Sequence, residues 1–253
     1  MCGRYASTKD PATLAAEFDA MDATDGHGPS VDHNVAPTKD VVAVVQRHPR
    51  DEQGEPDPDH TVRSLRVMRW GLIPPWSKDR SVGAKMINAR SETAATSRAF
   101  KSSVARRRCL LPADGWFEWR KEGGHKQPFF MTRPDGQSLA FAGLWTTWRD
   151  PADKDGPPLV SAAVLTTAAI GPLADIHDRM PLLMAPEQWA AWLDPDAEDP
   201  GELLTSPPPI DLIESLELRP VSSRVNNVRN NGPELVEREE QVTELDEPTL
   251  FDS

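Results

Sequence analysis

The stretch that decides the fold is WFEWRKEGGHKQPFFMTRPDGQSLAFAGLW, residues 116–145. It contains three runs rich in aromatic residues, 116–120, 128–132 and 138–145, and such runs are typical of strands. The segments between them, KEGGHKQ and RPDGQ, carry the glycine signals of hairpin turns. This stretch therefore predicts three antiparallel strands joined by two hairpins.

The sequence on either side extends the same pattern. It predicts further strands over 41–45, 61–70, 159–166 and 216–222, and helices over 94–104 and 186–193. Asp10 followed by Pro11 is typical of a helix start, with an N-cap residue and a proline in the first turn. Strands and helices do not alternate, which excludes a doubly wound parallel sheet. We predict a single α+β domain with a strongly bent, barrel-like antiparallel sheet and peripheral helices.

The composition is that of a soluble protein without cofactors. The chain has 253 residues, of which 38% are hydrophobic and 27% charged, and no apolar run approaches the length of about 18 that a membrane span needs. The start, MCGRYASTKD, lacks the apolar stretch of a secretory signal. Two cysteines cannot build a disulfide framework or a cysteine zinc site, and the six histidines lack metal-ligand spacing. We expect a cytoplasmic monomer with no metal, no cofactor and no membrane partner.

Charge is distributed very unevenly along the chain. The net charge is −12, yet residues 61–110 hold twelve lysines and arginines against two acidic residues. A basic block in an acidic protein is typical of a site for an anionic ligand, although a solvated face has the same composition. The triplet Arg106–Arg108 predicts a surface patch away from any base-reading element. Trp76, in a loop after two prolines, is expected to be exposed and to stack on a base.

Cys2 offers chemistry that no internal cysteine has. Removal of the initiator methionine, which is usual before a small residue, leaves an α-amine with a pKa of about 8 and a thiol with a pKa of about 8.5 on one residue. The amine condenses with an aldehyde to a Schiff base. The neighbouring thiol then closes a five-membered thiazolidine ring. The N-terminus is therefore a candidate covalent site for aldehydes.

Seven motifs follow one another along the chain. They are MCGRYA (1–6), HNVAPTK (33–39), WGLIPPW (70–76), INARSETAATSRAF (87–100), CLLPADGWFEW (109–119), FAGLW (141–145) and IHDRMP (176–181), with VNNVRNNGPEL (225–235) beyond them. Together they resemble the SRAP family, the SOS-response-associated peptidase domain, which includes shield proteins for abasic DNA. The resemblance covers nearly the whole chain.

The resemblance implies an enzyme of DNA damage repair, of the hydrolase or lyase class. Such a protein recognises abasic sites in single-stranded DNA and at junctions, and links Cys2 to the ring-opened sugar as a thiazolidine. Asn88 matches the family asparagine that positions the cysteine amine. Glu118 matches the active-site acid, and His177 matches the histidine beside the sugar.

The roles of these residues follow from their chemistry. Opening the closed sugar needs an acid at the ring oxygen, and His177 has a reference pKa of about 6.5, near working pH. Schiff-base formation moves protons onto and off the carbinolamine, and a buried Glu118 with a raised pKa suits that task. Asn88 can accept a hydrogen bond from the Cys2 amine and hold it in line with the aldehyde.

DNA contacts are predicted around the same pocket. Arg4, Arg90 and Arg179 each stand two positions after a site residue, and in extended backbone positions i and i+2 face the same way. Each arginine is therefore expected to take a phosphate beside its neighbour. Pro37 and Thr166 match family positions that line the site.

Two other functions use the same residues. In a cysteine peptidase, Cys2 would be the nucleophile, His177 the base and Glu118 the group that orients it, with the first bond of the chain itself as one substrate. In a non-catalytic reader of modified DNA, the basic block and Trp76 would bind without chemistry. Replacing Cys2 with Ser separates the first two functions, because a peptidase keeps weak activity with a serine nucleophile whereas thiazolidine closure is lost. Cys2→Ala identifies the reader, whose binding stays intact.

The chain is expected to divide into a domain over residues 2–232 and an acidic, disordered tail over 233–253. The tail holds eight acidic residues and one arginine. It ends in EPTLFDS, which resembles a clamp-binding peptide of bacterial replication proteins with Glu247 in place of the usual glutamine. Leu250 and Phe251 would dock on a sliding clamp; the alternative is a solvated tail that only adds solubility. The protein would be nucleoid-associated when bound to DNA.

Overall fold

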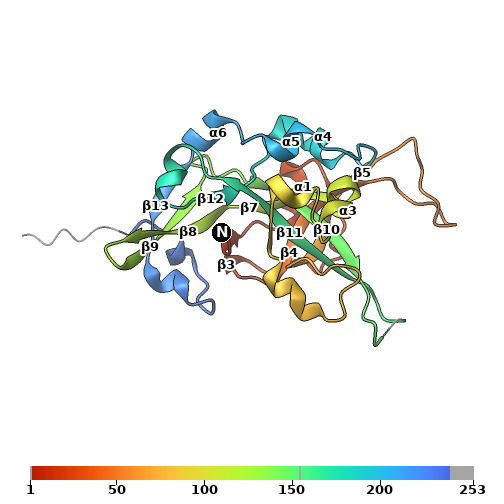
Figure 1. The fold of residues 1–253 in the computed structure, drawn as a ribbon, viewed down its shortest axis with the longest axis horizontal. Coiled ribbons are helices and arrows are strands. Elements are labelled where there is room, and N and C mark those ends of the chain that lie inside the picture. Colours follow the sequence, from red (N-terminus) through yellow and green to blue (C-terminus); the bar gives the residue numbers. More distant parts are fainter. Residues whose placement is uncertain (1, 154, 240–253) are drawn as a thin grey trace, which may run out of the picture.

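The computed structural model describes residues 2–153 and 155–239, apart from the side chain of Glu122. The chain forms two sheets with short helices around them (Figure 1). Within the described residues, no helix combines the length and the apolar character needed to cross a bilayer.

The larger sheet closes on itself. Its central strands lie in the order β11 (Leu159–Ala168), β10 (Leu139–Trp148), β7 (Arg108–Ala113), β4 (Asp40–Arg47) and β5 (Val62–Trp70). A parallel pairing of β11 with β5, in which Ser161 lies opposite Arg69, joins the two ends of this order. The predicted α+β fold with a bent, barrel-like sheet is therefore confirmed, and we call this ring of five strands the barrel.

The smaller sheet lies against one end of the barrel. Its order is β13 (Glu217–Pro220), β9 (His125–Thr132), β8 (Gly115–Glu122), β1 (Tyr5–Ser7) and β3 (Asp32–Val35). The hairpin predicted at KEGGHKQ is confirmed, since Lys121 pairs with Lys126. The second predicted hairpin is wrong: RPDGQ leads from β9 to β10, which belong to different sheets. Nearly every residue of β10 is buried, and the barrel buries both of its faces.

One run of backbone belongs to both sheets. β7 and β8 are separated by Asp114 alone, so the chain leaves the barrel and enters the smaller sheet almost without a break. Gly115 makes the crossing possible, because a Cβ at this position would clash with the carbonyl oxygen of Met131 and the ring of Phe130. The same run carries Glu118 four residues beyond the crossing.

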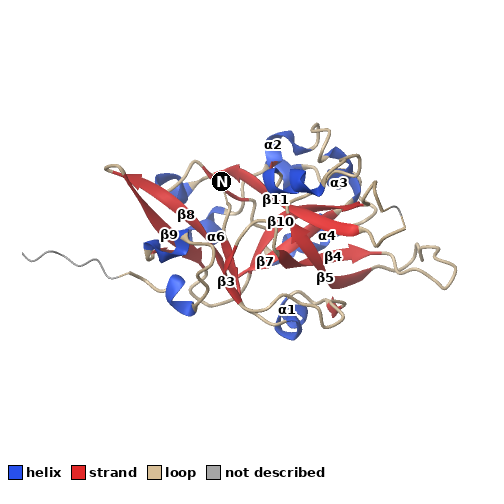
Figure 2. Cartoon of the chain, turned by 90° about the horizontal axis from the view of Figure 1, so that it is seen from below, coloured by secondary structure: helices blue, strands red, loops and turns tan. Residues whose placement is uncertain are grey.

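The helices are short and lie outside the strands (Figure 2). Helix α1 (Pro11–Glu17) begins as predicted, with the Asp10 carboxylate accepting the Thr13 N–H at 3.0 Å. The single helix predicted over 94–104 is wrong, because α2 (Ser91–Ala94) and α3 (Lys101–Arg106) are separate. The Thr93 carbonyl accepts from the backbone N–H groups of both Thr96 and Ser97, which ends the first helix.

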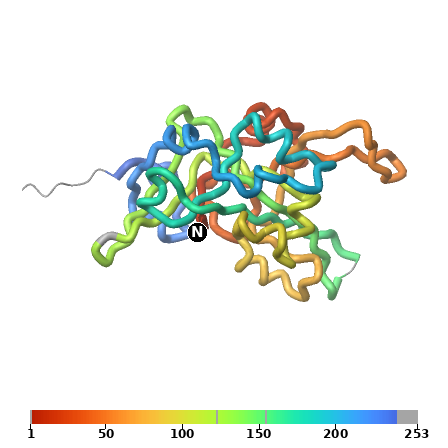
Figure 3. The backbone as a smooth tube through the Cα atoms, turned by 45° about the horizontal axis from the view of Figure 1, so that its top comes forward, coloured from red at the N-terminus to blue at the C-terminus, as the bar shows by residue number. Residues whose placement is uncertain are grey.

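The remaining elements connect these parts. Short strands are β2 (Met21–Asp22), β6 (Asn88–Arg90) and β12 (Arg179–Pro181). Helices are α4 (Trp189–Leu193), α5 (Glu202–Thr205) and α6 (Ile210–Glu214). Single 3-10 turns are η1 (Arg80–Lys85), η2 (Gly171–Asp175), η3 (Pro186–Gln188), η4 (Ser223–Asn226) and η5 (Pro233–Leu235). The long loop between β4 and β5 extends away from the rest of the molecule (Figure 3).

Ordered packing continues beyond residue 233, where we expected the tail to begin. Leu235 is fully buried in η5, and the Glu239 N–H donates to the Pro220 carbonyl at 2.9 Å. The remainder of the predicted tail, including Leu250 and Phe251, lies outside the described residues.

Candidate active site

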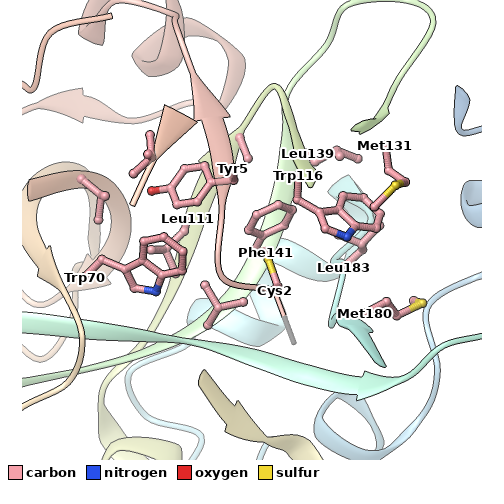
Figure 4. Close-up of a cluster of buried hydrophobic side chains, with 14 of the residues drawn as sticks. Cys2, Tyr5, Trp70, Leu111, Trp116, Met131, Leu139, Phe141, Met180 and Leu183 are labelled. Atoms are coloured by element: carbon pink, nitrogen blue, oxygen red, sulfur yellow. The ribbon is translucent and has the colours of Figure 1, made fainter. Parts of the chain in front are cut away.

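Cys2 lies in the hydrophobic core where the barrel meets the smaller sheet. Its exposed fraction is 0%, and it belongs to the same buried cluster as Tyr5, Trp70 and Phe141. The sulfur lies beside the Phe141 ring, with Trp116 on the other side of that ring (Figure 4). β1 begins three residues after Cys2 and pairs with β8, which fixes the backbone that follows Cys2.

Asn88 holds the backbone of Cys2. Its strand, β6, pairs in parallel with β11 through Asn88 and Val164. The Asn88 Nδ2 donates to the Cys2 carbonyl at 2.8 Å. The Oδ1 of the same amide is buried, and no described residue donates a hydrogen bond to it. Beside Cys2 there is thus a buried acceptor whose hydrogen-bonding capacity is unused.

Glu118 and His177 form the opposite side of the site. Glu118 is 3% exposed, and burial raises its pKa to about 7 from an ordinary value of 4.5. The His177 Nε2 lies 3.9 Å from the Glu118 Oε2. Near neutral pH this carboxyl group therefore exists in both its protonated and its ionised form, and either form faces the imidazole.

The other nitrogen of His177 has two neighbours that favour different protonation states. The Arg179 backbone N–H donates to Nδ1 at 2.9 Å, which requires that nitrogen to be unprotonated. The Asp178 carboxylate also lies 2.9 Å from Nδ1 and favours a proton there. Asp178 is 87% exposed, and burial, the larger effect, lowers the pKa of His177. The neutral form, with its proton on Nε2, is therefore favoured at neutral pH.

The thiol of Cys2 is kept uncharged. Burial raises its pKa well above the ordinary value, and the nearby Glu118 carboxylate raises it further. Burial thus favours the neutral forms of all three titratable groups of the site. Proton transfer within the site can then proceed without leaving an isolated buried charge.

A surface pocket opens onto this pair of residues. Besides Glu118 and His177 it is lined by Trp119, Lys121, Lys126 and Asn226. None of these four residues was predicted from the sequence. The lysines were visible in the hairpin turn KEGGHK, but only the fold shows that the hairpin borders the site. Their charges make this rim of the pocket basic.

Four of the predicted DNA contacts differ in exposure and in the partners that they have within the protein. Arg90 is exposed at the end of β6. Arg179 forms an ion pair with Glu92, at 2.5 and 2.9 Å, and donates to the Thr166 carbonyl at 2.6 Å. Thr166 is buried on β11, and Pro37 is half-buried in the turn after β3. Arg179 is thus already paired with a carboxylate, whereas Arg90 forms no ion pair with any described residue.

Arg4 and Trp76, two further predicted DNA contacts, both have partners within the protein. The Arg4 Nη1 donates to the Asn34 Oδ1 and the Val225 carbonyl at 2.7 and 2.8 Å, so this nitrogen is engaged within the protein, and the phosphate contact of Arg4 stays a prediction. Trp76 is 52% exposed, as predicted, and the Arg98 guanidinium lies 4.5 Å from the centre of its ring.

The prediction of a surface triplet at Arg106–Arg108 is wrong for Arg108. This side chain is buried and donates to backbone carbonyls from two segments, those of Val104, Trp192, Asp194 and Ala197. A buried guanidinium with five N–H groups can hold several carbonyls at once, so Arg108 joins α3 to the segment after α4.

Fold and site define a small α+β protein with a buried cysteine near its N-terminus, held by an amide and faced by an acid and a histidine. A model of the SOS response associated peptidase (SRAP) family matches residues 1–228. The chain belongs to this family, as the ordered motifs predicted.

Relatives in bacteria and in animals carry one shared description. The abasic site processing protein YedK of Escherichia coli is 36% identical, with 94% of this chain and 99% of that protein covered. The abasic site processing protein YoqW of Bacillus subtilis is 35% identical with the same coverage. The abasic site processing protein HMCES of Gallus gallus is 32% identical over 70% of this chain and 58% of its own.

Solved structures share the fold. A protein from Bacteroides thetaiotaomicron superposes with a TM-score of 0.74, covering 94% of this chain and 100% of its own at 20% identity. A protein from Bordetella bronchiseptica gives a TM-score of 0.66 at 26% identity, covering 87% and 100%.

Proposed function

We propose that the protein recognises abasic sites in single-stranded DNA and at junctions, and shields them by a thiazolidine crosslink through Cys2. Relatives of 32–36% identity are named abasic site processing proteins. The observation that carries the proposal is the position of Cys2, held by Asn88 and facing a carboxyl group with a pKa of about 7. A buried nucleophile thus lies next to an acid and a base that line a surface pocket.

The proposed reaction joins the amine and the thiol of Cys2 to the aldehyde carbon of the sugar. A proton from the imidazolium form of His177 assists opening of the sugar ring, which exposes the aldehyde. The Cys2 amine adds to that carbon, and Glu118 moves the protons that let water leave from the carbinolamine. The thiol sulfur then adds to the imine carbon, and its proton passes to the nitrogen. Overall, one C–N and one C–S bond form and one water is lost.

The amine in this sequence is the α-amine of Cys2, so the initiator methionine must be absent. Met1 lies outside the described residues, and its removal is part of the proposal. The unused Oδ1 of Asn88 supports it, because an α-amine at Cys2 would supply the hydrogen-bond donor that this buried acceptor lacks.

DNA binding in this proposal surrounds the pocket. Arg90 is exposed at one side, and Lys121 and Lys126 line the opening at the other. These cations would hold the phosphates on both sides of the lesion. Trp76, whose ring is half exposed, would stack on a neighbouring base, a contact worth about 1–3 kcal/mol.

The raised pKa of the Cys2 thiol supports crosslinking over peptidase activity. Cysteine peptidases depend on a thiolate, which a cationic histidine stabilises by lowering the thiol pKa. Here burial and Glu118 act in the opposite direction. Addition to an imine is intramolecular once the amine has reacted, so it does not need a standing thiolate.

The test is intact-mass spectrometry of the purified protein with and without an oligonucleotide containing one abasic site. We expect a mature chain without Met1, and an adduct equal to the sum of both molecules less one water. Cys2→Ala should give no adduct while keeping non-covalent binding.

Other outcomes would replace the proposal. Adduct formation by a protein that retains Met1 would rule out the thiazolidine. Hydrolysis of peptide substrates by wild type without any adduct would favour the peptidase, and unchanged lesion shielding by Cys2→Ala would favour the reader.

A further inference from the structure

The end of the barrel away from Cys2 carries a group of arginines. Along β4, alternate residues Val41, Ala43 and Val45 belong to the cluster inside the barrel, and Arg47 is next in that series. Along β5, Met68 and Trp70 belong to the same cluster, and Arg66 precedes them in the same alternation. Arg47 thus continues its inward-facing row to the open end, and Arg66, which is exposed and lies opposite Ala43, shares the inward-facing row of β5.

Trp145 forms the floor at this end. It lies on β10, is 7% exposed and belongs to the interior cluster. The Arg47 guanidinium lies 4.9 Å from the centre of the indole ring, and the Arg107 guanidinium lies 5.7 Å from it. Both distances are in the range of cation–π contacts. Two cations are therefore held beside one aromatic ring.

The charges of this group are not balanced by carboxylates. We call four residues the arginine mouth: Arg47, Arg50, Arg66 and Arg107. In the part of the chain that the structure describes, none of them forms an ion pair. Partial burial lowers the pKa of Arg47, and the charges of Arg107, Arg50 and Arg66 lower it further. Mutual repulsion of this kind is relieved when an anion binds among the cations.

The nearest acidic groups are engaged elsewhere. Glu198 pairs with Arg106, and the Asp194 carboxylate accepts the backbone N–H of Asp196. His48 contacts the Asp196 carboxylate through Nε2 at 3.1 Å. These acids lie along the border of the group and leave its centre positive.

A hollow of about 220 Å³ adjoins the arginine mouth. Its lining includes Arg47, Arg50, Arg106 and Trp145, with Asp194 at one side. Planar guanidinium groups bind phosphate oxygens through paired hydrogen bonds, and they do so better than lysines. The mouth of a barrel is also a place where ligand sites commonly form.

This hollow is separate from the pocket at Cys2. Asp40 and Trp70 mark the barrel end next to Cys2, since Trp70 contacts Tyr5, whereas Arg47 pairs with Val62 at the other end. The seven steps along β4 correspond to roughly 23 Å. In Figure 1 the loop after β4 likewise extends away from β3 and β8.

We propose that the arginine mouth is a second site of this protein and that it binds phosphate groups. Its ligand is either the backbone of a nucleic acid or a free compound that carries two or more phosphates. The site does not depend on the function proposed for Cys2, because no residue is shared between the two.

The test uses the full chain and titrates it with pyrophosphate in a calorimeter. Wild type should bind saturably, and Arg47→Gln/Arg107→Gln should bind at least tenfold more weakly. Arg149→Gln is the matched control, because Arg149 is exposed at the end of β10 and lies outside the group. It should bind like wild type. Pyrophosphate should also raise the Tm of wild type and leave that of the double variant unchanged.

An unmodified single-stranded oligonucleotide identifies the source of the phosphate. If the ligand is a nucleic-acid backbone, the double variant should lower the slope of log affinity against log salt by about 1.4, since two phosphate contacts are lost. If that slope is unchanged while pyrophosphate binding is lost, the ligand is a free phosphate compound. Absence of saturable pyrophosphate binding to wild type, or equal binding by the folded double variant, would overturn the proposal.

Discussion

The two ends of the barrel differ in the charge state of their titratable groups. At the Cys2 end the smaller sheet covers the strands, and burial drives the thiol, the carboxyl group and the imidazole toward their neutral forms. At the arginine mouth no sheet formed by the described residues covers the strands, and the four guanidinium groups remain charged and close together. The same inward-facing rows thus end in the site proposed for covalent chemistry where they are covered, and in the site proposed for phosphate where they are open.

Replacing Glu118 should have the largest effect, and only at the covered end. Glu118→Gln keeps the shape of the side chain but cannot exchange a proton, so the crosslinking rate should fall by about 10²–10³-fold. The inflection that Glu118 gives the pH–rate profile near its pKa of about 7 should vanish. Single-turnover rates between pH 5 and 9 test both statements.

The pH dependence of the free energy of unfolding is a second test of the Glu118 pKa. Its pKa in the folded protein lies above 4.5, so the folded state holds this proton more tightly than the unfolded state does. The free energy of unfolding should therefore fall as pH rises from about 4.5 to 7. Glu118→Gln should remove this part of the fall. An unchanged pH profile of rate and of stability would show that Glu118 does not titrate in this range.

Arg108 should affect stability without affecting chemistry. Arg108→Met leaves several buried carbonyls without donors, which should lower the free energy of unfolding by about 3–4 kcal/mol. Arg106→Met is the control, since Arg106 is exposed and pairs only with Glu198; its cost should stay below about 1 kcal/mol. Urea unfolding measures both. Equal effects of the two variants would contradict the structural role of Arg108.

Arg90 should affect DNA binding at the covered end. Arg90→Glu should weaken non-covalent binding of an abasic oligonucleotide to Cys2→Ala protein by about tenfold at low salt and reduce the salt slope by about 1. Arg149→Glu makes the same charge change at a distant exposed position and should change the affinity much less. Fluorescence anisotropy over a range of salt compares them, and matching slopes would place the phosphate contacts elsewhere.

Asp178 should have the smallest effect. Its carboxylate lies 2.9 Å from the His177 Nδ1 but is 87% exposed, so the pair contributes at most about 1 kcal/mol. Asp178→Asn should lower the pKa of His177 and slow the acid-assisted step by about two- to fivefold. NMR titration of the imidazole checks the direction, and a raised pKa would contradict it.

Local sequence patterns predicted much of this molecule. The strand over 41–45 was visible as a continuous apolar run, and the strand over 61–70 as a rough alternation of apolar and polar residues. The four residues predicted for the active site come from separate segments, and the fold brings them into two linked pairs, Asn88 with Cys2 and Glu118 with His177. The motifs that contain them identified these residues, whereas spacing alone did not.

Contacts between residues far apart in the sequence could not be predicted from it. The role of Arg4 depends on Val225, which is 221 positions away, and no local pattern indicates such a partner. Arg108 looked like its exposed neighbour Arg106 because only the segment after α4 buries it. RPDGQ has the composition of a hairpin, but composition does not say which sheet the next strand enters.

The burial of Cys2 also bears on oxidative damage. Peroxides attack the thiolate form of exposed cysteines and convert it to sulfenic and then sulfinic acid. Cys2 is fully buried and its pKa is raised, so in the free protein its sulfur should resist this attack. Oxidants also break DNA bases from their sugars. Under the proposed function, a cysteine that stays reduced in those conditions remains able to react at the time when abasic sites are most frequent.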